Sequence, residues 1–162
     1  MTVALLAFAA LAPPSLAQSP DLLAMLDGRW KGEGWARQNT DGDAEKVRCR
    51  IENTYFSKSE RLVVKGQCAV PGRKFDLTGT VSRRNGGDVI SGQWSNPFGT
   101  GNASVRGAQS GNRIDLDFSA PHPDTNRRAA HRMQWDIGDG TFSLTTRLVD
   151  DDITLSELRF SR

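Results

Sequence analysis

The chain has 162 residues, of which 37% are hydrophobic and 25% are charged, which is the composition of a folded globular protein. Its length suits one domain with a core of its own. The formal net charge is +2 at pH 7. This charge is too small to indicate a nucleic-acid partner, because such proteins usually concentrate basic residues on one face.

The N-terminus has the pattern of a signal peptide. Residues 1–17 are uncharged and strongly apolar, and Ser15-Leu16-Ala17 places small residues where a signal peptidase reads. The run is short for a membrane span and contains Pro13-Pro14. No Lys or Arg precedes it, which leaves open whether Met1 is the true start. We expect cleavage before Gln18 and a periplasmic or secreted domain of residues 18–162, with no transmembrane segment.

The mature chain is expected to begin with a short helix. Ser19-Pro20-Asp21 offers a hydroxyl cap, a proline at the first helical position and an acid in the first turn. Gly28 stands where a helix stop belongs. The apolar residues between them are Leu22, Leu23, Met25 and Leu26. So short a helix must pack on something, and we expect it to close one end of a barrel.

From Arg29 onward the hydrophobic period drops to two, which is typical of strands. Turn signals recur along the chain, and no second helical pattern appears. The outward positions carry many charges, which argues against a membrane barrel. We therefore predict an all-β, antiparallel up-and-down β-barrel of about eight to ten strands. A two-sheet sandwich is the alternative.

The two cysteines test the strand register. A turn at Ser57–Glu60 sets Cys49 directly across from Cys68, and directly opposed residues lie within disulfide reach. In an oxidising compartment they are expected to pair.

Further turns predict further pairs. Pro71-Gly72 places Phe75 opposite Cys68, and Asp139-Gly140 pairs Ile137 with Phe142 and Trp135 with Leu144. Asn85-Gly86 is predicted to pair Val81 with Ile90, Gly79 with Gly92, and Leu77 with Trp94. Ser110-Gly111 is predicted to pair Gly107 with Ile114, Val105 with Leu116, and Ala103 with Phe118. Longer loops are expected at 96–99 and 120–128, and a bulge is expected in the last strand, 153–162.

The segment Gly28-Arg29-Trp30-Lys31-Gly32-Glu33-Gly34 resembles the G-x-W opening of calycins, the lipocalin and fatty-acid-binding superfamily, and especially the G-x-W-x-G-x-G opening of nitrobindin-like barrels. With Cys49-Arg50, Cys68 and the strand Ile90-Ser91-Gly92-Gln93-Trp94, the mature chain is also similar to small exported proteins of unknown function in rhizobia and related alphaproteobacteria. That resemblance implies a periplasmic address and no established activity. Nitrobindin-like proteins hold haem through a histidine near the C-terminus. The last two expected strands here contain none, so we expect no cofactor.

The inward positions combine bulky aromatic residues with many glycines, which leaves room for one small apolar ligand in the lumen. The alternative is a barrel filled by its own aromatic side chains. Trp30 is better read as a plug at the barrel end than as a ligand contact. The candidate lumen residues are Trp30, Tyr55, Phe75, Trp94, Phe118, His131, Met133 and Trp135. His131, near the level of Asn53 and Tyr55, is either a polar anchor in the lumen, a metal ligand, or a hydrogen-bonded core histidine.

No pattern indicates catalysis or metal binding. The chain has no G-x-S-x-G elbow and no converging set of metal ligands, and Asp150-Asp151-Asp152 lacks the spacing of a calcium loop. We expect His122 to be exposed. Basic clusters at Arg127, Arg128 and Arg132, and at Arg48, Arg50, Arg61 and Lys65, are either solvated strand faces or contacts for an anionic partner.

Two functions remain for this expected monomer, and neither is enzymatic. The first is a periplasmic carrier or sensor of a small apolar molecule. The second is an envelope interaction protein such as a protease inhibitor, because some small disulfide-bearing inhibitor barrels begin with L-x-G-x-W, as Leu26-Asp27-Gly28-Arg29-Trp30 does. A continuous cavity lined by Trp94, Met133 and Trp135 favours the first function. A filled barrel with either an ordered, exposed N-terminal segment or a protruding 120–128 loop favours the second.

Overall fold

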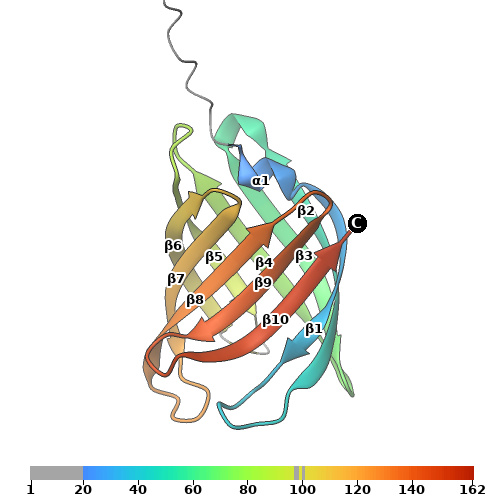
Figure 1. The fold of residues 1–162 in the computed structure, drawn as a ribbon, viewed down its shortest axis with the longest axis vertical. Helices are drawn as coiled ribbons and strands as arrows, with labels where there is room; N and C mark the ends of the chain where they lie inside the picture. Colours follow the sequence, from blue (N-terminus) through green and yellow to red (C-terminus); the bar gives the residue numbers. More distant parts are fainter. Residues whose placement is uncertain (1–19, 97–98, 100) are drawn as a thin grey trace, which may run out of the picture.

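The computed structural model describes residues 20–96, 99 and 101–162. Within them, ten antiparallel strands form one closed barrel, in which each strand pairs with its neighbours in the chain and β1 pairs with β10 (Figure 1). The predicted all-β up-and-down barrel with a short N-terminal helix is confirmed, and the sandwich is excluded. The elements are α1 (Leu22–Met25), β1 (Gly28–Ala36), β2 (Glu45–Phe56), a 3-10 turn (Ser57–Ser59), β3 (Arg61–Val70), β4 (Arg73–Arg83), β5 (Val89–Asn96), β6 (Gly101–Ser110), β7 (Arg113–Pro121), β8 (Arg128–Ile137), β9 (Thr141–Leu148) and β10 (Ile153–Ser161).

The start of α1 differs from the prediction. Asp21 is the N-cap, and its carboxylate accepts a hydrogen bond from the Ala24 backbone N–H at 3.3 Å, which a side-chain carboxylate at this position does well. The predicted cap, Ser19, and the predicted signal peptide, residues 1–17, lie outside the described residues. The predicted stop is also displaced, because α1 ends at Met25 and Gly28, with a φ of +114°, opens β1 instead.

The helix closes one end of the barrel, as expected. Leu22, Leu23 and Leu26 are buried. The backbone carbonyl of Leu26 accepts hydrogen bonds from Trp30 Nε1 and from Asn53 Nδ2, each at 2.9 Å. These two bonds satisfy a carbonyl that the short helix leaves free, and they join the helix to β1 and β2.

The disulfide is confirmed. Cys49 and Cys68 face each other across the β2–β3 ladder and are bonded, with their Cα atoms 4.0 Å apart. The same register pairs Ile51 with Gly66, so the turn at residues 57–60 sets the hairpin as predicted. The pairs predicted from Pro71-Gly72 and Asp139-Gly140 are also present, as is a register shift between Thr154 and Ser156 in β10.

The predicted register of the β4–β5 hairpin is wrong by two residues. Asn85 and Gly86 do form a tight turn with positive φ values, and the Gly87 N–H donates to the Arg84 carbonyl. However, the Glu60 carboxylate accepts a hydrogen bond from the Gly86 N–H at 2.9 Å. Gly87 and Asp88 stay outside the β4–β5 ladder. The ladder therefore pairs Arg83 with Ile90, Val81 with Gly92, and Gly79 with Trp94.

The β6–β7 hairpin is also shifted by two residues. The two-residue loop is Gly111-Asn112 rather than Ser110-Gly111, since Ser110 pairs with Arg113 and Gly107 with Leu116. Gly111 has a φ of +59°, as the first loop position of a type II′ turn requires. Both errors keep inward residues opposite inward residues, so the hydrophobic pattern alone does not reveal them.

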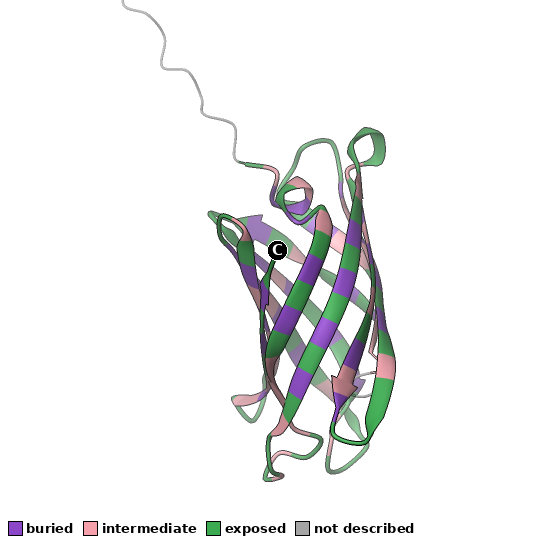
Figure 2. Cartoon of the chain, turned by 90° about the vertical axis from the view of Figure 1, so that its right-hand side faces the viewer, coloured by how far each residue is buried: buried purple, intermediate pink, exposed green. Residues whose placement is uncertain are grey.

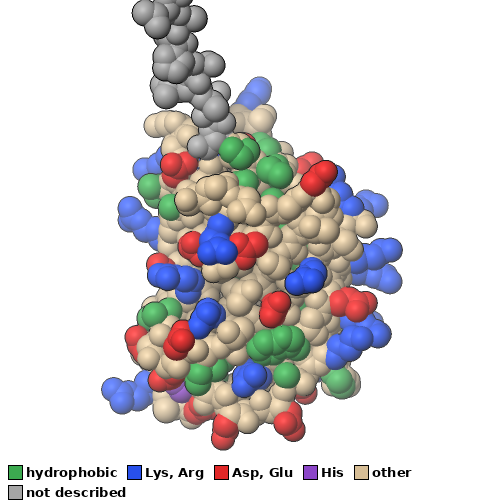
Figure 3. Space-filling model, viewed as in Figure 1, with side chains coloured by type: hydrophobic (Ala, Val, Ile, Leu, Met, Phe, Trp, Pro, Cys, Tyr) green, Lys and Arg blue, Asp and Glu red, His purple; other side chains and the backbone are tan. Residues whose placement is uncertain are grey.

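Buried and exposed residues alternate along the strands (Figure 2). The outer face carries both signs of charge (Figure 3), with ion pairs such as Arg113–Asp136 and Arg132–Asp117, each at 2.7 Å.

Inside, the half of the barrel next to α1 is filled with aromatic side chains. Phe142 stacks on Phe160 at 4.5 Å between ring centroids and meets Trp30 edge-on at 5.0 Å.

Candidate functional site

The other half of the barrel holds a cavity of about 390 Å³. It opens between the loops at the end opposite α1, and segment 37–39 and residues of the β7–β8 loop form part of its mouth. Its deeper wall is mainly apolar and comes from strands β2 to β5 and β7 to β10. The side chains there are Val47, Cys68, Phe75, Leu77, Trp94, Phe118, His131, Met133, Leu144, Thr146 and Leu158.

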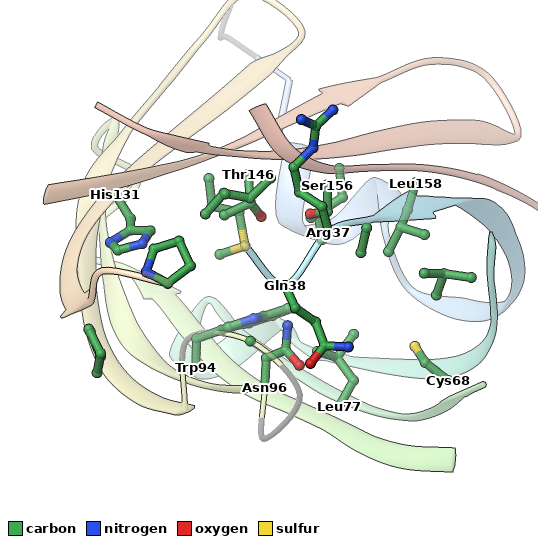
Figure 4. A pocket seen from close by; sticks show the side chains of 18 of the residues that line it. Arg37, Gln38, Cys68, Leu77, Trp94, Asn96, His131, Thr146, Ser156 and Leu158 are labelled. Atoms are coloured by element: carbon green, nitrogen blue, oxygen red, sulfur yellow. The ribbon is translucent and has the colours of Figure 1, made fainter. Parts of the chain in front are cut away.

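The structure brings together five of the eight predicted lumen residues. Phe75, Trp94, Phe118, His131 and Met133 line the cavity, and Figure 4 shows Trp94 and His131 at its wall. The other three predicted residues lie away from it.

Those three residues support the filled half instead. Trp30 lies beneath α1 at the end of the barrel, the position predicted for a plug. Trp135 packs behind Trp94, with ring centroids 5.7 Å apart. Tyr55 lies at the end of the barrel that α1 closes, where its hydroxyl donates to the Asp21 carboxylate. Tyr55 and Asn53 are therefore not level with His131, and that prediction is wrong, because β2 carries them to the end of the barrel opposite the cavity.

His131 is the most distinctive polar group of the cavity wall, and its side chain is only 1% exposed. Its ring stacks on Phe118, with a centroid distance of 5.3 Å. Its Nδ1 lies 3.2 Å from the Ala129 carbonyl oxygen. Because a carbonyl only accepts, Nδ1 carries the proton and donates. Burial lowers the pKa of His131, so the imidazole is neutral at pH 7.

In this tautomer Nε2 of His131 is a bare hydrogen-bond acceptor. It is buried and has no partner among the described residues. Buried polar atoms are usually paired, and Nε2 of His131 and Nε of Arg37 are two exceptions on residues that line the cavity.

The second histidine, His122, also lines the cavity, but the prediction that it is exposed is wrong. Its side chain is 17% exposed, and its Nε2 lies 2.9 Å from Asp151 Oδ2. Its Nδ1 accepts from the Asp124 backbone N–H at 3.1 Å, so Nε2 carries the proton and donates to Asp151.

Asp124 extends this network across the mouth. Its carboxylate accepts hydrogen bonds from the Thr40 N–H, at 3.1 Å, and from the Thr40 hydroxyl. These bonds lower the pKa of Asp124. The predicted 120–128 loop is shorter than expected, since Ala120 and Pro121 belong to β7 and Arg128 to β8. What remains of it, residues 122–127, is thus tied to the β1–β2 and β9–β10 loops.

Charge is kept out of the cavity. Among the described residues that line it, Arg37 is the only Lys, Arg, Asp or Glu. The Arg37 guanidinium lies over the Trp35 ring at 5.1 Å and donates to the Thr40 carbonyl at 3.2 Å. Figure 4 shows the guanidinium directed away from the cavity. The surface of the cavity is therefore made of apolar side chains, neutral polar groups and His131.

Several members of the basic and acidic clusters found in the sequence are engaged locally. Arg132 pairs with Asp117, and Arg128 donates to the Ser119 hydroxyl at 3.1 Å. Asp151 contacts His122, and Asp152 pairs with Arg147. No group of three or more His, Cys, Asp or Glu within the described part of the chain could hold a metal ion.

The haem of nitrobindin-like barrels does not fit this site. Their histidine lies near the C-terminus, whereas neither β9 nor β10 carries a histidine here. His122 already has partners at both ring nitrogens, and His131 belongs to β8.

No protein-family model matches the chain, and no curated protein matches it. None of the helices described here is long and apolar enough to cross a membrane.

Proposed function

We propose that this protein is an exported carrier or sensor that holds one small, mainly apolar molecule in the cavity of its barrel. The observation that carries the proposal is the cavity itself, with a volume of about 390 Å³ and walls formed mostly by apolar side chains. Small-molecule sites are typically concave, largely apolar and roughly 300–1,000 Å³ in volume, with a few polar groups that orient the ligand.

The division of the barrel supports the same reading. Aromatic side chains pack together in the half beneath α1, and the hydrophobic core continues from there into the apolar wall of the cavity. A barrel that served only as a scaffold would gain stability by filling this space as well. The export that the proposal includes rests on residues 1–17 and on the disulfide.

The interaction-protein alternative has less support. It called for a filled barrel, together with either an ordered, exposed N-terminal segment, which lies outside the described residues, or a protruding loop between β7 and β8. That loop is instead held against the neighbouring loops through Asp124 and His122.

A cavity-filling variant tests the proposal. The probe is N-phenyl-1-naphthylamine, an uncharged dye that becomes fluorescent in apolar sites. Thr146→Trp places a large ring in the cavity, and we expect it to weaken dye binding by about tenfold or more. The matched control is Thr145→Trp, since Thr145 is on the opposite face of the same strand, across from Gln134.

The proposal predicts saturable binding by the wild type and by the Thr145 variant. It is wrong if the wild-type protein does not enhance the fluorescence of the dye, or if the Thr146 variant binds the dye as tightly as the wild type does.

A further inference from the structure

The unpartnered Nε2 of His131 indicates that the ligand carries a hydrogen-bond donor. A buried acceptor without a donor costs free energy, of the order of 1–3 kcal/mol. The free protein bears this cost at a residue that forms part of the cavity wall. Because Nε2 itself has almost no exposed surface, a molecule would remove this cost by entering the wall at His131 and placing an O–H or N–H beside Nε2.

The ring of His131 is held so that it can serve as such an acceptor. The Ala129 carbonyl fixes the proton on Nδ1, and stacking on Phe118 restrains the plane of the ring. The neutral state maintained by burial keeps the lone pair on Nε2 available. Orientation of a histidine by a second partner is a usual feature of ligand-binding imidazoles.

The groups around the cavity disfavour anionic ligands. A carboxylate would meet the lone pair of a neutral imidazole rather than a proton. It would also lose its hydration without a cation directed toward it, because the Arg37 guanidinium points away from the cavity (Figure 4).

We infer that the ligand is an uncharged molecule with an apolar body and a hydroxyl group, of the phenol or alcohol class, and that the hydroxyl donates a hydrogen bond to Nε2 of His131. The apolar body would then lie against Trp94, Met133 and Phe75, which line the same cavity. This inference rests on the proposed function, because it needs a ligand in the cavity.

Two probes that differ only in the donor provide the test. 1-Naphthol carries the hydroxyl, and 1-methoxynaphthalene replaces its proton with a methyl group. We expect the wild type to bind 1-naphthol about tenfold more tightly in isothermal titration calorimetry, as one satisfied buried hydrogen bond would give. In His131→Phe, which keeps an aromatic ring beside Phe118, we expect the two affinities to be equal.

The matched control is His122→Phe. His122 lines the same cavity, but both of its ring nitrogens already have partners, so this variant should keep the tenfold preference. Far-UV circular dichroism of each variant establishes that the barrel is folded. If the His131 variant does not fold, His131→Gln, which retains a hydrogen-bond acceptor, should fold and should keep part of the preference for 1-naphthol.

The outcomes separate the two claims. Equal binding of both probes by the wild type would overturn the hydroxyl inference and leave the proposed function standing. A preference that survives in the His131 variant would also overturn it, and so would tighter binding of 1-naphthoate than of 1-naphthol at pH 7.5. If the wild type binds neither probe and no N-phenyl-1-naphthylamine, the proposed function itself is wrong.

Discussion

At the scale of single residues, the closed barrel depends on glycines that allow strands and rings to approach. A Cβ on Gly92 would lie 1.9 Å from the Thr80 carbonyl oxygen, and a Cβ on Gly79 would lie 2.3 Å from the ring of Trp94. Glycine in a strand interior often marks such a close approach. Trp94 therefore reaches the cavity wall because the residue opposite it has no side chain.

We predict that Gly92→Ala destabilises the barrel by about 1–3 kcal/mol, the usual range for overpacking. The neighbouring Ser91 is on the opposite face of β5, and Ser91→Ala is the control, with little expected change. Urea denaturation followed by tryptophan fluorescence measures both variants. An unchanged midpoint for Gly92→Ala would contradict the close approach of β4 and β5.

Tyr55 offers a second test at this scale, because it is the only tyrosine in the chain. Burial, together with the hydrogen bond to Asp21, raises its pKa from 10.0 to about 12. The absorbance of tyrosinate near 295 nm should therefore titrate well above pH 10 in the folded protein. Because the folded-state pKa is the higher one, this contribution to stability is complete below pH 10 and is lost between pH 10 and about 12. A midpoint at pH 10 in folded protein would show that Tyr55 does not contact Asp21.

At the scale of elements, the β2–β3 hairpin is fixed twice, by its register and by its disulfide. Cys49 and Cys68 are separated by 19 residues, and closing a loop of this size stabilises a fold by about 3 kcal/mol in the chain-entropy account. We expect the double variant Cys49→Ala, Cys68→Ala to lose about 2–4 kcal/mol in urea denaturation. Peptide mapping of the wild type under non-reducing conditions should recover the two segments as one linked species. Two free thiols in protein purified from the cell envelope would contradict both this register and the export that we propose.

The hairpins also show which parts of the fold a sequence can predict. The turns at residues 57–60, 71–72 and 139–140 were predicted correctly because local turn chemistry and strand parity agree there. At Asn85-Gly86 the local signal was correct, but Glu60, from the preceding hairpin, holds the turn and the ladder shifts by two residues. Parity cannot detect such a shift, because it moves inward residues onto inward positions.

At the scale of the whole molecule, the barrel is built in two halves, a packed core beneath α1 and a cavity beneath the loops. The sequence predicted the inward set, but not which members of that set would meet a ligand. Trp30, Tyr55 and Trp135 share the inward parity of Trp94, and only their height along the barrel separates them from the cavity. The link between Thr40 and Asp124 spans 84 residues, and no local pattern could have indicated it.

The measurement that tests the central claim most directly is native mass spectrometry of the mature protein, purified from its own cell envelope without detergent. The account predicts a reproducible additional mass that is lost on denaturation, and it predicts that the released molecule is uncharged and carries a hydroxyl group. It also predicts that the Thr146→Trp protein, purified in the same way, lacks this mass. A wild-type protein that shows only the mass of its polypeptide, and that takes up none of the naphthalene probes, would contradict the claim that this barrel carries a ligand.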